Sequence, residues 1–391
     1  MSFPVEIDEA SLIDFARRLV ITPSLSQEER AVAELVAVEM ERLEYDEVRV
    51  DPMGNVVGRL IGQPGGATLL FNGHLDHAGV GNMVEPFSGR IMDGTPFGYA
   101  GPVLYGRGAS DMKGGLAAMV YGVAAARRHG APRFGEILVT AVVREEMAQG
   151  EGIKYLLQQG GMRADFAVSG EATNLQTYVG HRGKAEFKIT TFGRTSHAGY
   201  PAGGVNAVLH MHRLIDAILK GYHLPRHEVL GEATFTIIDI AASPGRLTPI
   251  VPDRCEIILD RRFFPEETPQ GLMAELVALV DQLRLTDPSF KTEIELLKFF
   301  PALLTNPESD IVGQALEARR QVLGDTGRIG TWYFGVDGTF LDKFGIPCVG
   351  FGPGDEYFAH TPEDHVPLDH LVKAAAVYAQ MVINVGSNKK E

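Results

Sequence analysis

The stretch from Leu104 to Gly115, LYGRGASDMKGG, decides how the rest of the chain is interpreted. Its glycines permit backbone angles and close approaches that a side chain would prevent, so it favours a tight turn that places one functional group. That group is Asp111, and the apolar run 116–123 predicts a helix that leaves the turn. Two interpretations of Asp111 stay open at this point: a cap of the helix N-terminus, which is the ordinary role of such a residue, or a metal ligand.

Other segments place an acidic or imidazole side chain directly after an apolar, strand-like run. These side chains are His74, Asp76, Glu145, Glu146, Glu171 and His360. In an α/β sheet, ligands bind beyond the carboxyl ends of the strands. Each histidine taken alone is more often an ordinary core or surface residue. Several candidate ligands at strand ends together indicate one common site.

The N-terminal part predicts two helices, over residues 11–20 and 31–43, because apolar residues recur there with helical spacing. Ser26 and Glu29 have the spacing of a capping box ahead of the second helix. The runs 47–50 and 55–60 flank a Met-Gly turn and predict a pair of strands.

Strands and helices then alternate, which predicts an α/β fold. The expected elements are strands at 68–72, 137–143 and 166–168 and helices at 116–128 and 152–159. From residue 179 the pattern changes to two strand–helix–strand units, and the α/β pattern resumes afterwards. We therefore expect a mixed-sheet domain made of residues 1–178 and 293–391, with an inserted α+β domain over residues 179–292.

The amino-acid composition excludes some classes of binding partner. The 391 residues are 45% hydrophobic and 22% charged, which suffices for a large core, and the net charge is -14. This acidity argues against nucleic acid or an anionic membrane as partner, and no apolar run is long enough to span a bilayer. Cys255 and Cys348 lie in apolar runs, which favours free thiols and a cytoplasmic location. We expect a small-molecule substrate.

A site for two metal ions needs a carboxylate that bridges them, further nitrogen and oxygen ligands, and an open position for water. We assign Asp111 as the bridge. His74 and Glu171 complete one metal position, and Glu146 and His360 complete the other.

Two more acidic residues are assigned supporting roles in this chemistry. Asp76 lies two residues beyond His74, so it is expected to accept the other ring N–H of His74 or to bind near it. Glu145 is expected to act as the base, because adjacent residues point in different directions and Glu146 can bind metal while Glu145 moves a proton.

The motifs resemble those of the dinuclear zinc amidohydrolase and exopeptidase family, whose members include acetylornithine deacetylase, succinyl-diaminopimelate desuccinylase, aminoacylase and glutamate carboxypeptidase. They are HLD at 74–76, the glycine-rich turn at 106–115, Glu145-Glu146, Gly170-Glu171 and His360. The resemblance implies a metallopeptidase-type catalytic domain with two zinc ions, for which cobalt or manganese can substitute. It also implies an inserted dimerisation domain, a homodimer, and hydrolysis of an amide bond in a small N-acyl amino acid or dipeptide with a free carboxylate.

The resemblance extends to three further residues. TSHAGYP at 195–201 is similar to the dimerisation-domain signature, which implies that His197 reaches the active site of a partner subunit and polarises the scissile carbonyl. The alternative is a histidine with local hydrogen bonds only. Arg262 resembles the arginine that receives a substrate carboxylate, and Gly352 could offer a backbone amide to the same end. Pro249 stands where many relatives carry asparagine, so no particular substrate is implied.

Two other classes of function remain as alternatives. A binding protein that keeps the scaffold without the chemistry would bind metal or ligand and hydrolyse nothing. A nucleotide-dependent enzyme would use residues 106–115 to hold phosphate, but this stretch has neither the G-x-x-x-x-G-K-[ST] order nor G-x-G-x-x-G.

Overall fold

The computed structural model describes residues 5–222, 224–245 and 249–387, and the chain divides into two compact units. The larger unit comprises Met1–Gly180 and Leu303–Glu391, and the inserted unit comprises His181–Ala302. The boundary predicted at 292/293 is corrected by this division, since it would cut strand β14 (Lys291–Phe300). That strand pairs along its length with β9 (Gly183–Phe192), so backbone hydrogen bonding keeps it in the inserted unit.

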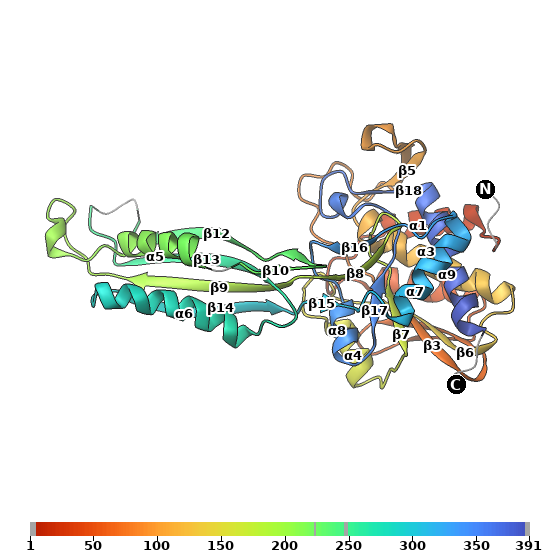
Figure 1. The fold of residues 1–391 in the computed structure, drawn as a ribbon. Helices are drawn as coiled ribbons and strands as arrows, with labels where there is room; N and C mark the ends of the chain where they lie inside the picture. The colour runs from red at the N-terminus through yellow and green to blue at the C-terminus, as the bar shows by residue number, and fades with distance from the viewer. Residues whose placement is uncertain (1–4, 223, 246–248, 388–391) are drawn as a thin grey trace. The chain divides into compact units, whose positions relative to one another are not determined.

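A mixed nine-stranded sheet forms the centre of the larger unit (Figure 1). In sheet order the strands are β1 (Glu47–Val50), β2 (Val56–Ile61), β6 (Phe134–Val142), β3 (Gln63–His74), β7 (Phe166–Ser169), β17 (Cys348–Gly350), β8 (Thr177–His181) and β15 (Leu303–Leu304), with β16 (Ile329–Trp332) paired to β8. The four central strands, β6, β3, β7 and β17, are mutually parallel. Their carboxyl ends therefore lie along one edge of the sheet, as the sequence predicts.

Helices cover this sheet. α1 (Glu9–Ile21), α3 (Gly114–Arg128), α7 (Asp310–Leu323) and α9 (Leu368–Gly386) pack together as one layer, while α4 (Glu151–Gln158) contacts α8 (Gly338–Lys343), which lies on β7 and β17 (Figure 1). α2 (Arg30–Arg42) packs on β1 and β2. Gly122 allows the close approach of α3 to α9, because a Cβ there would lie 2.5 Å from the carbonyl oxygen of Ala375. Within the described residues, no helix is both long and apolar enough to cross a bilayer.

A second, three-stranded sheet leads into the glycine-rich turn. Its strands are β4 (Arg90–Asp93), β5 (Pro102–Tyr105) and β18 (His365–Pro367), with β5 in the middle. None of these three strands is predicted from the sequence, because they are short and mostly non-periodic. β5 ends one residue before Gly106, so this sheet fixes where the turn begins.

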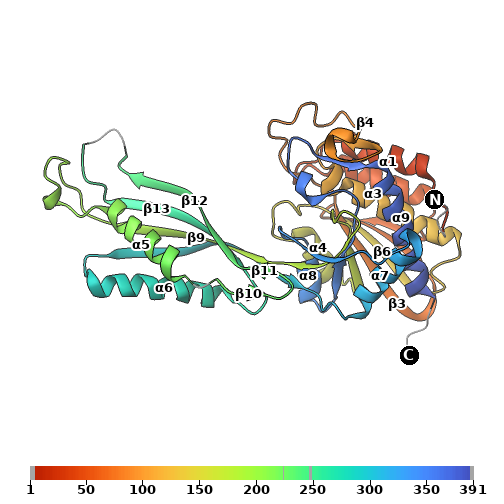
Figure 2. The ribbon, with the colours of Figure 1, turned by 45° about the horizontal axis from the view of Figure 1, so that its top comes forward.

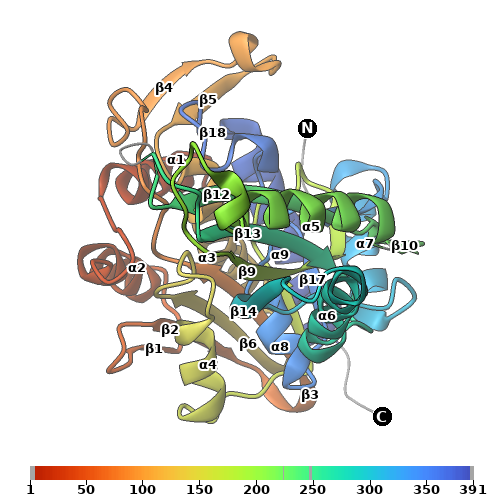
Figure 3. The same ribbon diagram turned by 90° about the vertical axis from the view of Figure 1, so that its left-hand side faces the viewer.

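The inserted unit is an antiparallel sheet with two helices on it (Figures 2 and 3). The strand order is β12 (Thr234–Ser243), β13 (Arg254–Phe263), β9 and β14, with a short pair formed by β10 (Arg226–His227) and β11 (Gly231–Glu232). α5 (Ala207–Gly221) and α6 (Pro269–Thr286) contact each other and the sheet, and their apolar faces form a core with inward residues such as Phe187 and Leu259. This is the separate α+β domain that the sequence predicts.

Candidate metal centre

The glycine-rich turn presents Asp111 between β5 and α3. Gly108 has a φ of 81°, which an L side chain rarely adopts, and the turn 109–113 is a wide helical turn in which Asp111 itself is extended, with a φ of −122°. A Cβ at Gly115 would lie 2.0 Å from the carbonyl oxygen of Gly170, so glycine is required where α3 passes the segment that carries Glu171. The glycine-rich turn therefore makes the close backbone approach that its sequence predicts, here to the segment that carries Glu171.

The structure brings the five predicted ligands together. The ligand atoms of His74, Asp111 and Glu146 all lie within 4.8 Å of one another. Glu171 joins them through Oε1, which is 3.4 Å from Nε2 of His74. His360 joins them through Nε2, which is 3.0 Å from Oε2 of Glu146.

The two carboxylate oxygens of Asp111 face different partners. Oδ1 lies 3.0 Å from Nε2 of His74, and Oδ2 lies 3.1 Å from Nε2 of His360. A carboxylate that presents one oxygen to each side is what a bridge between two metal ions requires. Glu171 contacts His74, and Glu146 contacts His360.

His74 is held in the tautomer that suits a ligand. Its Nδ1 lies 3.0 Å from the carbonyl oxygen of Asp76, which only accepts, so Nδ1 carries the proton of the neutral ring and Nε2 presents a lone pair. The Asp76 carboxylate is farther from Nδ1, at 3.5 Å. Asp76 thus accepts the ring N–H through its backbone, and its carboxylate lies near the same ring.

The Asp76 carboxylate instead holds the Glu145-Glu146 dipeptide. Oδ1 accepts the backbone N–H of Glu145 and Oδ2 accepts that of Glu146, each at 3.1 Å. Ser26 donates its hydroxyl to Oδ2 at 2.6 Å, and Glu29 accepts the backbone N–H of Arg144 at 3.0 Å. The capping box predicted for Ser26 and Glu29 is wrong, because both side chains are engaged by the site and α2 begins without a side-chain cap.

The charges of this cluster indicate that cations are needed. Asp111 and Glu171 are 7% and 3% exposed, and among the described residues their ion pairs are made only with His74 and His360. Oε2 of Glu171 is buried and has no hydrogen-bond partner, and burial together with Asp111 raises the pKa of Glu171 to about 7. Buried carboxylates without compensating charge are costly, and two imidazoles with three carboxylates suit zinc, with cobalt or manganese as substitutes. The residues therefore fit a pair of divalent cations.

Glu145 lies in a second group of acids beside the ligands. Burial raises its pKa well above the usual range, and the charges of Asp337, Glu171 and Glu146 act in the same direction while His74 opposes them. Asp337, which is 3% exposed at the start of α8, was not identified from the sequence as a site residue. The only local signal in the sequence is the Asp-Gly pair at 337–338, which indicates a turn and not a site.

His197 and Arg262 belong to the inserted unit. His197 is exposed, and its Nδ1 accepts the backbone N–H of Gly199 at 3.0 Å, so its neutral ring carries the proton on an exposed Nε2. Arg262 lies on β13 and binds Asp260 through Nε at 2.7 Å and Nη2 at 3.3 Å. Both residues thus belong to the inserted unit, whereas the five predicted ligands belong to the larger unit.

The expectation for Gly352 is corrected by its hydrogen bonds. Its backbone N–H donates to Oγ1 of Thr173 at 3.0 Å and so is not available to a substrate carboxylate. A Cβ at this position would lie 2.2 Å from the carbonyl oxygen of Glu171. Gly352 therefore allows a loop to pack against the backbone of a predicted ligand.

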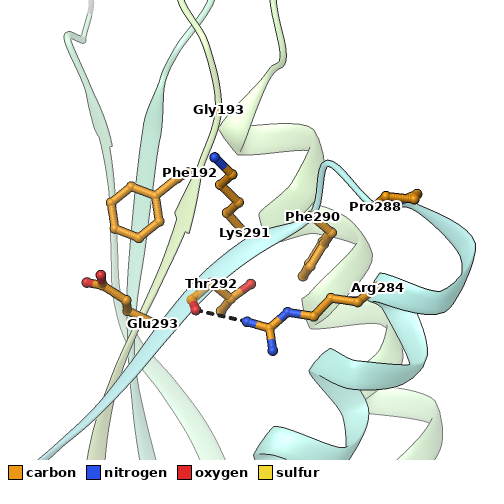
Figure 4. Close-up of a pocket in the computed structure, with 8 residues that line it drawn as sticks. All are labelled: Phe192, Gly193, Arg284, Pro288, Phe290, Lys291, Thr292 and Glu293. Atoms are coloured by element: carbon orange, nitrogen blue, oxygen red, sulfur yellow. Dashed lines mark hydrogen bonds between the residues drawn. The ribbon is translucent and has the colours of Figure 1, made fainter.

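The inserted unit has an open pocket of its own, of about 690 Å³ (Figure 4). It is lined by Phe192, Gly193, Arg284, Pro288, Phe290, Lys291, Thr292 and Glu293. Arg284 donates to the carbonyl oxygen of Thr292 at 3.2 Å (Figure 4). No residue predicted for the site lines this pocket, so the metal cluster stands as the candidate functional site.

Fold and site together define a metal-dependent hydrolase with a mixed α/β catalytic unit and a separate antiparallel-sheet unit. Residues 70–384 match Peptidase family M20/M25/M40. The chain belongs to this family and is a dinuclear metal-dependent peptidase or amidohydrolase.

Relatives match along nearly the whole chain. The uncharacterized protein YgeY of Escherichia coli K12 is 32% identical over 397 residues, covering 96% of this chain and 94% of that protein. Succinyl-diaminopimelate desuccinylase of Methylobacterium radiotolerans is 30% identical over 389 residues, covering 94% and 95%.

Solved structures show the same fold. A tripeptidase of Staphylococcus aureus superposes with a TM-score of 0.79 at 22% identity, covering 97% of this chain and 99% of that chain. The YXEP protein of Bacillus subtilis, described as a dinuclear metal-binding peptidase, superposes with a TM-score of 0.73 at 16% identity, covering 96% and 98%. At these identities the likeness concerns the fold.

Proposed function

We propose that this protein hydrolyses the amide bond of a small N-acyl amino acid or dipeptide that carries a free carboxylate. The observation that carries the proposal is the placement of Asp111, whose two carboxylate oxygens face His74 and His360 on opposite sides. We assign His74, Asp111 and Glu171 to one metal ion and Asp111, Glu146 and His360 to the other. Zinc is the proposed metal. When bound, such a pair polarises the scissile carbonyl and lowers the pKa of water toward neutrality.

Glu145 is the proposed general base and acid. It takes a proton from the attacking water and passes it to the leaving nitrogen, so that the amine departs neutral. Burial, together with the charges of neighbouring carboxylates, raises its pKa, and perturbed pKa values are typical of catalytic acids and bases. Asp76 keeps this carboxylate in place by holding the backbone N–H of Glu145 and Glu146.

The inserted unit is proposed to supply substrate contacts. His197 would donate from Nε2 to the carbonyl oxygen that gains charge, within a homodimer, and the hydrogen bond from Gly199 supports this because it leaves Nε2 as the donor. Arg262, held by Asp260, would receive the substrate carboxylate. An Arg262→Ala variant is then expected to raise KM more than it lowers kcat. The buried free thiols of Cys255 and Cys348 support the cytoplasmic setting that we propose.

The test is a hydrolysis screen on metal-loaded protein. Chelator-treated protein is reloaded with zinc, cobalt or manganese and assayed against acetyl, succinyl and aminoacyl conjugates of amino acids. We expect turnover of at least one conjugate, and a Glu145→Gln variant is expected to keep two metal ions while losing about 10²–10⁴-fold in kcat. Two bound ions with no hydrolysis of any conjugate would contradict the proposal and favour a non-catalytic binding protein.

A further inference from the structure

One buried carboxylate organises the turn that carries Asp111. Asp364 is fully buried, and its Oδ2 accepts the backbone N–H of Gly108 at 2.7 Å and Nη1 of Arg107 at 3.1 Å. Its Oδ1 accepts the backbone N–H of Ser110 at 2.9 Å. The carboxylate therefore holds three donors of the segment that ends directly before Asp111.

The same residue belongs to the segment that carries His360. Only three residues separate Asp364 from His360, and the strand that follows, β18, pairs with β5, which leads into the glycine-rich turn. The backbone N–H of Gly106 also donates to the carbonyl oxygen of Asp364 at 3.1 Å. Both the backbone and the side chain of Asp364 thus join the two segments.

The joined segments present the two side chains that face each other across the site. Nε2 of His360 lies 3.1 Å from Oδ2 of Asp111. His360 has a φ of 62°, a conformation that a non-glycine residue keeps only when its surroundings impose it. Unlike His74, which ends a central strand of the sheet, His360 lies in a loop, and its side chain is 53% exposed. Its position therefore depends on what fixes that loop.

We propose that Asp364 is a positioning residue that sets the separation between Asp111 and His360, and with it the affinity of the site for its metal ions. This inference rests on the proposed metal site and gives a role to a residue that is not one of the five proposed ligands. Without the carboxylate, the amides of Gly108 and Ser110 lose their acceptor and the turn before Asp111 is free to shift relative to the His360 loop. Residues that orient metal ligands typically change metal affinity by about 10–100-fold when they are replaced.

Glu39 provides a matched control for the loss of a buried carboxylate. It is 2% exposed, lies on α2, and accepts hydrogen bonds from Arg18 at 2.7 Å and Tyr121 at 2.6 Å. Both carboxylates thus bind an arginine and one or more further donors, and both are buried in the larger unit. Of the two carboxylates, only that of Asp364 joins the segments of Asp111 and His360. Replacement of either residue is therefore expected to lower the stability of the fold, and only replacement of Asp364 is expected to weaken metal binding.

The experiment measures metal binding directly. Wild-type, Asp364→Asn and Glu39→Gln proteins are freed of metal and titrated with zinc by calorimetry, and the visible absorption of their cobalt forms is recorded. Asparagine keeps the shape of Asp364 but offers a single acceptor oxygen. We expect wild-type protein to bind two ions, Asp364→Asn to bind at least one of them about 10–100-fold more weakly with an altered cobalt spectrum, and Glu39→Gln to bind as wild type does.

The outcomes separate this proposal from the proposed function. Wild-type affinity and spectrum in Asp364→Asn overturn the positioning role and leave the metal site intact. Equal weakening in Glu39→Gln overturns it too, because the effect would then follow stability alone. Wild-type protein that binds neither ion overturns both proposals. Should Asp364→Asn fail to fold, Arg107→Lys, which loses the guanidinium contact, must still weaken metal binding more than Glu39→Gln does.

Discussion

The carboxylate of Asp76 accepts the backbone N–H of Glu145 at 3.1 Å, so an acid at the end of one strand fixes the segment that follows the neighbouring strand. β3 and β6 are parallel neighbours, which brings residues 69 positions apart in the chain into hydrogen-bond distance. The same carboxylate holds Glu146. One side chain therefore orients both members of the dipeptide to which we assign metal binding and proton transfer.

Replacement of Asp76 by asparagine is expected to lower kcat by about 10–100-fold, because one of the two backbone N–H groups loses its acceptor and Glu145 is less well placed. The measurement is steady-state kinetics together with metal content. Ser26→Ala is the graded control, since it removes only the hydroxyl that donates to Asp76 at 2.6 Å and should cost less. Unchanged kcat in Asp76→Asn would remove Asp76 from this role.

Replacement of Gly352 by alanine is expected to destabilise the fold by about 1–3 kcal/mol, the usual cost of forcing an extra group into a packed interior. The new Cβ would lie 2.2 Å from the carbonyl oxygen of Glu171, so backbone must move. Gly313→Ala is the control, since nothing lies within 4 Å of its Cβ position in α7 and alanine there should stabilise by about 0.5–1 kcal/mol. Urea denaturation of both variants measures the difference. Equal urea midpoints for Gly352→Ala and Gly313→Ala would contradict the prediction, because they would show that the loop of Gly352 shifts at no cost in stability.

Removal of metal is expected to lower the melting temperature. Ions that bind only the folded chain stabilise it by about 2.7 kcal/mol when free metal exceeds Kd by about 100-fold. Thermal unfolding with chelator and with added zinc measures the shift. Glu145→Gln should show the full shift because Glu145 is not an assigned ligand, whereas Asp111→Asn should show much less. A chelator-insensitive melting temperature in wild-type protein would argue against the metal assignment.

Acid is expected to remove the stability that Glu39 contributes. Burial raises the pKa of its carboxyl, but hydrogen bonds from Arg42, Arg18 and Tyr121 outweigh this and hold the pKa below the ordinary value of 4.5. A carboxyl whose pKa is lower in the folded state stabilises fully above pH 4.5 and loses that contribution as pH falls through the folded pKa. The free energy of unfolding of wild type should exceed that of Glu39→Gln by about 1–3 kcal/mol near neutral pH. A gap that stays constant down to pH 3 would contradict the prediction.

The parts of the site that could be predicted from the sequence are those set by local pattern. Short apolar runs identify β3, β6 and β7 as buried strands, and parallel strands must align their carboxyl ends, so His74, Glu146 and Glu171 had to approach one another. Asp111 could be predicted as their partner because glycines surround it in the sequence. These signals lie within a few residues of each side chain, and the regular geometry of a strand or a turn then determines where that side chain is placed.

The hydrogen-bond partners of the supporting residues could not be predicted in this way. Ser26 and Glu29 have the spacing of a helix cap, yet they bind Asp76 and the backbone of Arg144, which are 50 and 115 residues away in the chain. The N–H of Gly352 binds Thr173, and Asp364 binds the turn before Asp111 across 254 residues or more. A polar group takes the partner that packing brings closest.

By itself, then, the sequence determined the α/β pattern, the inserted unit and the residues gathered at the strand ends, because backbone periodicity and glycine are local properties. Only the tertiary structure decided that β14 belongs wholly to the inserted unit, that Asp76 orients Glu145 and Glu146, and that Asp364 joins the segments of Asp111 and His360. These are contacts between distant segments, and a buried donor or acceptor finds its partner only when the surrounding elements have packed.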